Sequence, residues 1–318
     1  MNYKDSGVDV DLAENLVEEY LTDFSSQIGK FAASMDTPIR SHSSDLVVSV
    51  DGVGTKTILA KQYKELTNAP LSNIGKDCVA MVMNDILCEY GRPIMFMDYF
   101  ATNKLVKTDF LEVLTGMREY CLQMRIPILG GETAEMPGMF ARDAFDVCGF
   151  GAGIKWEKFV DIKEGDLVIG YESNGVHSNG FSLIRKIIED NYGGLMNFIS
   201  EVPGMASDLL KPTKLYYENV FALFKLGLDV GGFAHITGGG WKNINRVIPN
   251  GFSVEWNLEE KYYSNHHIFE WIQEQSKLSD EEMKNTFNCG IGMMAIIQGY
   301  RAEELMGEFT VLGEIKKS

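Results

Sequence analysis

The chain has 318 residues, of which 45% are hydrophobic and 23% charged, so intrinsic disorder, collagen and coiled coil are excluded. Its 29 Lys and Arg against 45 Asp and Glu give a formal net charge of −16. A duplex-binding protein usually has a basic face, so this charge argues against nucleic acid as a partner.

The first half of the chain alternates strand and helix patterns. A modest amphipathic helix is expected over residues 9–24. Helices with apolar side chains at three- and four-residue spacing are expected at 74–87 and 108–125. Short apolar runs, many of them glycine-bounded, predict strands at 45–50, 94–101, 126–129 and 145–154.

The second half repeats this mixture after a charged stretch at 155–165, which is the best domain boundary. Strands are expected at 167–171, 252–256, 292–298 and 309–315, and helices at 178–190, 212–226, 267–276 and 280–285. Interleaved strands and helices in both halves predict two domains of the α/β or α+β class, over 1–157 and 158–318.

Two further features bear on location. No stretch reaches the run of about 18 uncharged apolar residues that a membrane span needs, and the N-terminus has no apolar signal core. The five cysteines are odd in number and have no CxxC spacing, which favours reduced thiols over disulfides or zinc. We therefore expect a cytoplasmic protein without a membrane partner.

Polar residues at element ends are candidates for a nucleotide and metal site. In the first such turn, Asp51–Lys56 (DGVGTK), two glycines allow close backbone approach, and Thr55 and Lys56 can donate to phosphate oxygens. The GxxxxGK[ST] spacing of a Walker A loop is absent, and a purely structural turn is the alternative. Asp85 is either a solvated helix end or a metal ligand, and together with Asp51 and Glu132 it could hold Mg²⁺.

Glycine-rich segments form the second group of candidates. Gly130–Met139 (GGETAEMPGM) follows a strand and is either a binding loop or a turn with exposed acids. Gly175–Gly180 (GVHSNG) precedes a helix, so Ser178 or Asn179 can cap it and leave an anion site behind the cap. His177 is either a packed histidine or an acid–base or phosphate contact. Ala234–Gly240 (AHITGGG) also favours close approach to a ligand.

Together these stretches resemble the phosphoribosylformylglycinamidine cyclo-ligase (aminoimidazole ribonucleotide synthetase) family. They occur in family order and span nearly the whole chain, and GGETAEMPGM and HSNGFSL are its specific motifs. The matching stretches are YKDSGVD (3–9), DGVGTK (51–56), VAMVMND (79–85), MDYFAT (97–102), GGETAEMPGM (130–139), GVHSNGFSLIRKI (175–187), LLKPTKLYY (209–217), AHITGGG (234–240) and TFNCGIGM (286–293).

The resemblance implies a homodimer in which the N-terminal domains build a shared β-barrel and the C-terminal domain is an α/β layer. It implies ATP- and Mg²⁺-dependent ring closure of formylglycinamidine ribonucleotide to aminoimidazole ribonucleotide, in purine biosynthesis. Such chemistry needs charge neutralisation and alignment rather than a strong protein nucleophile.

The resemblance also assigns roles by position. Mg²⁺ would be held by Asp51, Asp85 and Glu132. The catalytic group is His177, Asp85 and Lys56, with Lys56 near phosphate. The nucleotide would contact Lys4, Asp51, Gly52, Gly54, Thr55, Lys56, Asn84, Asp85, Gly131, Glu132 and Thr133. The substrate would contact His177, Ser178, Asn179, Thr237 and Gly238.

One departure from the family keeps alternatives open. Members usually have a glycine-rich run before the DGVGTK strand, whereas residues 25–33 here contain a single glycine, and Lys30 could substitute by charge. One alternative is a diverged, non-catalytic paralogue that binds nucleotide. The other is a different reaction of the superfamily, namely thiamine monophosphate phosphorylation, selenophosphate synthesis or hydrogenase maturation.

Overall fold

The computed structural model describes residues 32–36, 45–141, 144–155, 159–257, 267–299 and 309–318. The first half contains β1 (Ala33–Asp36), β2 (Asp45–Gly52), α2 (Lys56–Thr67), α3 (Ser72–Cys88), β3 (Gly91–Thr102), α4 (Lys107–Met124), β4 (Ile128–Glu135) and β5 (Phe145–Lys155). The second half contains β6 (Leu167–Glu172), α5 (Phe181–Tyr192), α6 (Leu195–Glu201), α7 (Met205–Leu209), α8 (Tyr217–Lys225), β7 (Val230–His235), η2 (Gly240–Arg246), β8 (Phe252–Trp256), α9 (His267–Ser276), α10 (Asp280–Thr286), β9 (Ile291–Ile297) and β10 (Thr310–Lys317).

Each half builds one five-stranded sheet. The first has the order β1-β2-β5-β3-β4, and only its β3–β4 pair is parallel. The second has the order β7-β9-β6-β10-β8 and is antiparallel throughout. Mostly antiparallel sheets with helices beside them make this an α+β fold, which is one of the two predicted classes. The predicted boundary at 157/158 falls outside the described residues and stays a prediction.

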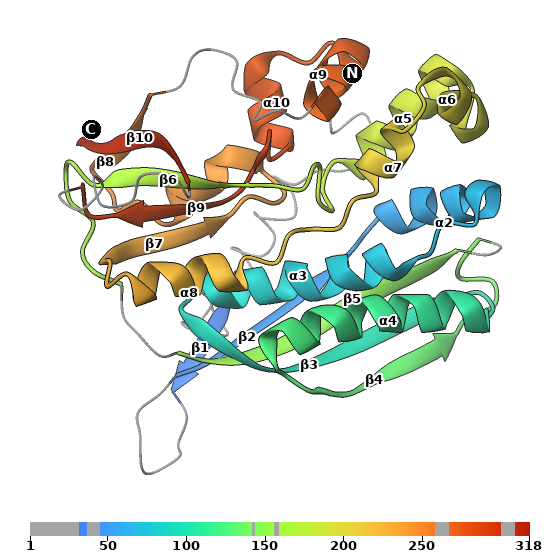
Figure 1. Ribbon diagram of the computed structural model, residues 1–318, viewed down its shortest axis with the longest axis horizontal. Coiled ribbons are helices and arrows are strands. Elements are labelled where there is room, and N and C mark those ends of the chain that lie inside the picture. The colour runs from blue at the N-terminus through green and yellow to red at the C-terminus, as the bar shows by residue number, and fades with distance from the viewer. Residues whose placement is uncertain (1–31, 37–44, 142–143, 156–158, 258–266, 300–308) are drawn as a thin grey trace.

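Helix α3 lies between the two sheets (Figure 1). It packs on β2, β3 and β5 of the first sheet and also contacts β7 of the second. Almost all of its residues are buried, which explains its continuous apolar character. Helix α4 lies against it so closely that a Cβ on Gly75 would lie 1.9 Å from the Val113 carbonyl oxygen. Gly75 and Gly116 therefore set the distance between these two helices.

Among the described residues, no helix covers the opposite face of the first sheet (Figure 1). Val50, Phe150 and Met97 lie in one cross-strand row on that face, and Tyr99 lies two residues farther along β3. These four apolar side chains are between 37% and 66% exposed. We call the side of the sheet that carries these side chains the outer face, and the helix-covered side the inner face.

Several predicted elements differ from the structure at their ends. Strand β4 continues through 130–135, where a binding loop was predicted, because these residues pair with β3. The helix predicted at 178–190 begins only at Phe181, after a left-handed Gly180, so Ser178 and Asn179 do not cap it. Residues 230–235, which include the predicted loop residues Ala234 and His235, form the buried strand β7.

The helix predicted at 212–226 begins only at Tyr217. Residues 210–216 instead form a segment outside any helix or strand, which runs along α3 (Figure 1), because α3 and α4 side chains satisfy their backbone groups. Asn73 donates to the Leu210 carbonyl, Asn84 to the Lys214 carbonyl, and Tyr120 to the Thr213 carbonyl. Periodicity alone does not reveal such tertiary contacts.

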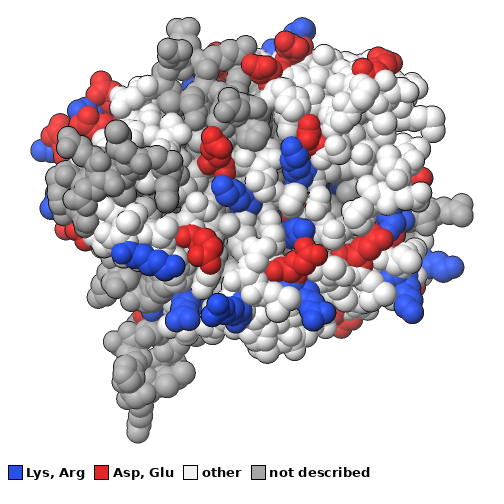
Figure 2. All heavy atoms as spheres, viewed as in Figure 1, with Lys and Arg blue, Asp and Glu red and all other residues white. Residues whose placement is uncertain are grey.

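The arm at Tyr3–Asp5, which includes Lys4, the helix at 9–24 and most of the glycine-poor run lie outside the described residues. Within the described part of the chain, no helix combines the length and apolarity that a membrane crossing requires. Figure 2 shows acidic and basic side chains interspersed on the viewed face, without a continuous basic stripe among its described residues.

Candidate active site

Two partly buried carboxylates mark the junction of the sheets. Asp51 is near the end of β2, and Asp85 is on α3. Burial, and next the negative charge of Asp85, raise the pKa of Asp51 to about 6. Burial also raises the pKa of Asp85, although its hydrogen bond with His235 opposes the change. The structure thus brings together two of the three predicted metal ligands, in an environment that opposes their ionisation.

His235 orients Asp85. Its Nδ1 lies 2.8 Å from Asp85 Oδ1, and its Nε2 lies 3.3 Å from Asn84 Nδ2. An amide nitrogen only donates, so Nε2 accepts and Nδ1 carries the proton that His235 donates to Asp85. Asn84 also accepts from the Tyr216 backbone N–H at 3.0 Å. The predicted nucleotide residue Asn84 therefore holds the second half of the chain, and His235, a residue without a predicted role, positions Asp85.

The sheet register separates Glu132 from the other two acids. Asp51 and Asp98 are both opposite Gly149, and Asp98 is opposite Gly131, so these four residues share one row on the inner face. Glu132 belongs to the next row, with Tyr99 and Cys148, and alternation turns it to the outer face. Within one chain, Glu132 therefore does not join Asp51, as the predicted metal set required.

Asp98 stands where sequence reasoning expected Glu132. Burial raises the pKa of Asp98 to about 6. A Cβ on Gly131 would lie 2.5 Å from Asp98 Oδ1, so this glycine leaves room for the carboxylate. The signal was present in the sequence as the acid of MDYFAT, but an acid inside an apolar strand pattern does not by itself reveal which face it takes.

The structure gives Lys56 a place away from the predicted phosphate contact. Its side chain is fully buried, and its ammonium forms an ion pair with Asp77 at 2.8 Å. The same group donates to the carbonyl oxygens of His177 and Lys211, each at 2.7 Å. These three partners use all the donors of an ammonium, so none is left for a phosphate. The expected role of Lys56 is corrected accordingly.

The predicted substrate residues come from two loops that meet. Asn179 Oδ1 lies 3.7 Å from the Cβ position of Gly238, so GVHSNG and TGGG are neighbours. The Asn179 amide nitrogen is buried and has no hydrogen-bond partner within the described structure. Ser178 bonds the Thr213 hydroxyl at 3.0 Å, and the Thr237 hydroxyl accepts from Asn243 at 3.3 Å. The Asn179 amide therefore has a buried donor available for a ligand.

The DGVGTK turn contacts the second half at Thr55, whose hydroxyl lies 3.1 Å from that of Ser182. Gly54 has a left-handed φ of 70° and open space around its Cβ position, and the N–H of Gly52 donates to Asp51 Oδ1 at 2.7 Å. Thr133 is exposed on β4, opposite Phe100 and two rows from Asp98. The turn is thus joined to the first turn of α5 rather than isolated at the surface.

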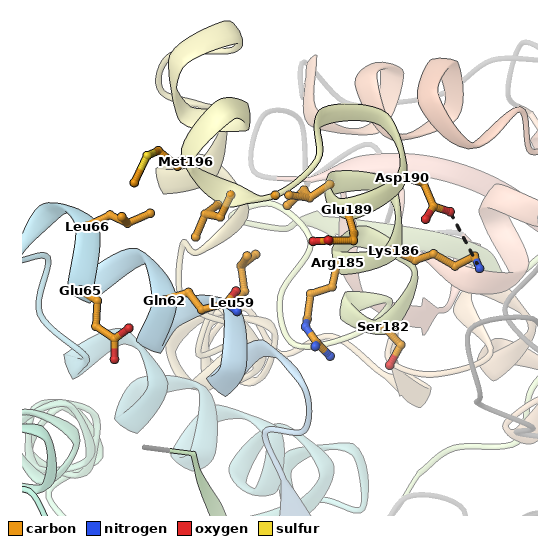
Figure 3. A pocket seen from close by; sticks show the side chains of 13 residues that line it. Leu59, Gln62, Glu65, Leu66, Ser182, Arg185, Lys186, Glu189, Asp190 and Met196 are labelled. Carbon is orange, nitrogen blue, oxygen red and sulfur yellow. Dashed lines mark ion pairs between the residues drawn. The ribbon is translucent and has the colours of Figure 1, made fainter. Parts of the chain in front are cut away.

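A groove of about 640 Å³ lies beside this contact, between α2 and the helices α5 and α6 (Figure 3). Arg185 and Lys186 are its cations, whereas Glu65, Glu189 and Asp190 are its acids. With more acids than cations, the groove does not offer a triphosphate a positive field by itself. A nucleotide bound near it would need a cation, for which Asp51 and Asp85 are candidate ligands.

The donor set fits Mg²⁺ only in part. Asp51 and Asp85 are hard oxygen donors, and burial raises the pKa of each. Among the described residues, however, no group of three or more His, Cys, Asp or Glu is arranged to hold a metal ion. The chain can therefore supply two carboxylates, and further oxygen ligands would have to come from the bound phosphates or water.

Comparison with known proteins decides the family. The AIR synthase related protein N-terminal domain matches residues 29–154, and the C-terminal domain of the same family matches 163–317. The chain belongs to the AIR synthase related family. The phosphoribosylformylglycinamidine cyclo-ligases of Burkholderia multivorans and Burkholderia cenocepacia are each 38% identical to this member over 99% of its chain and 91% of their own. The predicted resemblance is confirmed.

Solved structures agree on the fold of this family member. AaThiL complexed with AMPPCP and TMP aligns with a TM-score of 0.68 at 16% identity, covering 100% of this chain and 93% of that one. The HypE-HypF complex aligns with a TM-score of 0.65 at 15% identity, covering 98% and 94%. At such identities the likeness shows a common fold and carries no statement about the reaction.

Proposed function

We propose that this protein closes the imidazole ring of aminoimidazole ribonucleotide from formylglycinamidine ribonucleotide, at the expense of ATP, in purine biosynthesis. Cyclo-ligases identical at 38% over nearly the whole chain support this reaction. The observation in the structure that carries the proposal is the partly buried Asp51–Asp85 pair, in which Asp85 is bonded to His235, two residues before Thr237. AaThiL, which has the same fold, is complexed with AMPPCP, and this supports ATP as the nucleotide.

The reaction places clear demands on these residues. The formyl amide oxygen attacks the γ-phosphorus of ATP and ADP leaves; an amidine nitrogen then attacks the activated carbon, and phosphate and a proton leave. Asp51 and Asp85 would hold Mg²⁺, which neutralises the triphosphate when bound. Gly52, Gly54 and Thr55 would allow the phosphates to approach the backbone. Asn179 and Gly238 would contact the ribonucleotide, with His177 beside them.

Two further parts of the proposal concern the state of the protein. A reducing, cytoplasmic location is supported by its five cysteines, all of which are free thiols. A homodimer that pairs through the outer face is supported by the apolar row of Val50, Phe150 and Met97. In such a dimer, Glu132 would face the partner rather than the Asp51–Asp85 pair of its own chain.

The test mixes purified protein with ATP, Mg²⁺ and formylglycinamidine ribonucleotide. We expect aminoimidazole ribonucleotide and ADP in equal amounts. Asp85→Asn keeps the shape but removes the charge, and should lower kcat by about 10²-fold or more. Asp161→Asn, an exposed acid before β6, is the matched control and should retain the parent rate.

Other outcomes separate the alternatives. ADP release with thiamine monophosphate or selenide, but not with formylglycinamidine ribonucleotide, would assign a different reaction of the superfamily. Tight binding of an ATP analogue in calorimetry without any turnover would identify a non-catalytic paralogue. Turnover of Asp85→Asn at the parent rate would remove the carboxylate pair from the mechanism.

A further inference from the structure

The ion pair between Lys56 and Asp77 is buried at the contact between the two halves of the chain. Both side chains are 0% exposed, and their atoms approach to 2.8 Å and 3.0 Å. Burying two charges is costly unless other hydrogen bonds satisfy them. Here every further partner comes from the second half, which indicates that the pair serves that contact rather than the first domain alone.

Asp77 binds the 210–216 segment. Its Oδ1 accepts from both the backbone N–H and the hydroxyl of Thr213, each at 2.7 Å. Asn73, Asp77 and Asn84 are spaced four and seven residues apart, so they lie on one face of α3. That face therefore forms a row of side chains that bind the backbone of the segment.

Lys56 holds the GVHSNG loop. It donates to the His177 carbonyl, and His177 has a left-handed φ of 63°, which is uncommon for a residue other than glycine. Ser178, the next residue, bonds the Thr213 hydroxyl that also binds Asp77. The loop and the 210–216 segment are thus tied to the same two charges.

We propose that Asp77, acting through Lys56, is a positioning residue that fixes the 177–179 loop of the second half relative to Asp51 and Asp85 of the first. This inference rests on the proposed function, because it supposes that the two sides bind different reactants. The formyl amide oxygen, bound on one side, must then be positioned against the γ-phosphorus of ATP, bound on the other, with an error of only a fraction of an ångström. A contact that fixes the relative position of the two sides therefore affects kcat more than it affects the affinity for either reactant.

The test compares the parent with Lys56→Met/Asp77→Asn. This double variant removes both charges together and so avoids an unpaired buried ion, and its new amide oxygen can still accept from Thr213. We expect kcat to fall by roughly 10²-fold, as for a small misplacement of reacting groups, while KM for ATP and for the ribonucleotide stays close to the parent value. Lys61→Met is the control, because it breaks an α2–α4 ion pair with Asp109 inside the first half.

Hydrogen exchange gives a readout that needs no turnover. Amides of 174–180 and 210–216 should exchange at least about tenfold faster in the double variant, while α9 is unchanged. Unchanged exchange in these segments overturns the proposal, and so does parent kcat despite faster exchange. An inactive parent would defeat the proposed function, whereas exchange would still measure the link.

A second variant covers the case in which the double variant fails to fold. Thr213→Val keeps the backbone N–H on Asp77 but removes the hydroxyl that joins Asp77 to Ser178. We expect kcat to fall less than in the double variant, and the amides of 177–180 to exchange faster than in the parent. Parent values for both measurements would count against the proposal.

Discussion

Burial and the charge of Asp85 raise the pKa of Asp51 to about 6, against 3.8 for an ordinary aspartate. Between these pH values the folded protein retains a proton that the unfolded chain has already released. The contribution of Asp51 to stability is therefore lost as the pH rises through this window. Keeping such a carboxylate ionised at neutral pH, as a metal site would require, therefore lowers the free energy of unfolding.

Asp51→Asn should consequently stabilise the metal-free protein while impairing turnover. We expect the free energy of unfolding to rise by about 1–2 kcal/mol near pH 7.5, with partial exposure reducing the full effect, and to change little near pH 4. Urea unfolding at both pH values, with chelator present, measures the difference. Asp161→Asn is the exposed control, and an equal gain at both pH values would contradict the linkage.

At the residue scale, the sequence indicated which acids lie at element ends, but not which face of the sheet each side chain takes. Asp51, Asp85 and Glu132 were all predicted at element ends, and two of them do come together. Glu132 is one row away from Asp98, and a single step along a strand changes its face. The contacts of Lys56 could not be predicted from the sequence either, because its partners Asp77, His177 and Lys211 are distant along the chain.

At the element scale, prediction succeeded where local pattern and burial agree. The helix expected at 74–87 is α3, whose apolar positions face the first sheet on one side. It failed for 212–216, because tertiary hydrogen bonds replace the helical ones there. It also failed for β4, where GGETAE has turn-forming residues but pairs with β3. Such contacts cannot be read from propensity.

The contact between α3 and α4 gives a test at this scale. A Cβ on Gly116 would lie 1.8 Å from the Ser72 carbonyl oxygen, so Gly116→Ala must force the helices apart. We expect a loss of about 2–3 kcal/mol in the free energy of unfolding, despite the better helix propensity of alanine. Denaturant unfolding measures it, with Thr115→Ala on the exposed side of α4 as the control. Parent stability for Gly116→Ala would show that the helices can separate at little cost.

For the whole molecule, the predicted two-domain α+β arrangement is found, and its two sheets enclose α3. The net charge is −16, and the interdomain groove has more acids than bases, so an anionic ligand bound there would need local charge compensation. The sequence alone could not predict an interface with a second chain. An apolar residue on the outer face of a strand has the same sequence pattern whether it contacts solvent or a partner.

The outer face provides the last prediction. Phe150 lies at its centre on β5, between Val50 and Met97, and is 40% exposed. If two copies pair through this face, Phe150→Glu places a charge in the contact and should leave a species of 35.6 kDa, whereas the parent has twice that mass. Leu122→Glu alters an apolar side chain on α4 that is 61% exposed and should remain dimeric. Light scattering measures all three; a parent of 35.6 kDa at micromolar concentration would refute pairing by this face.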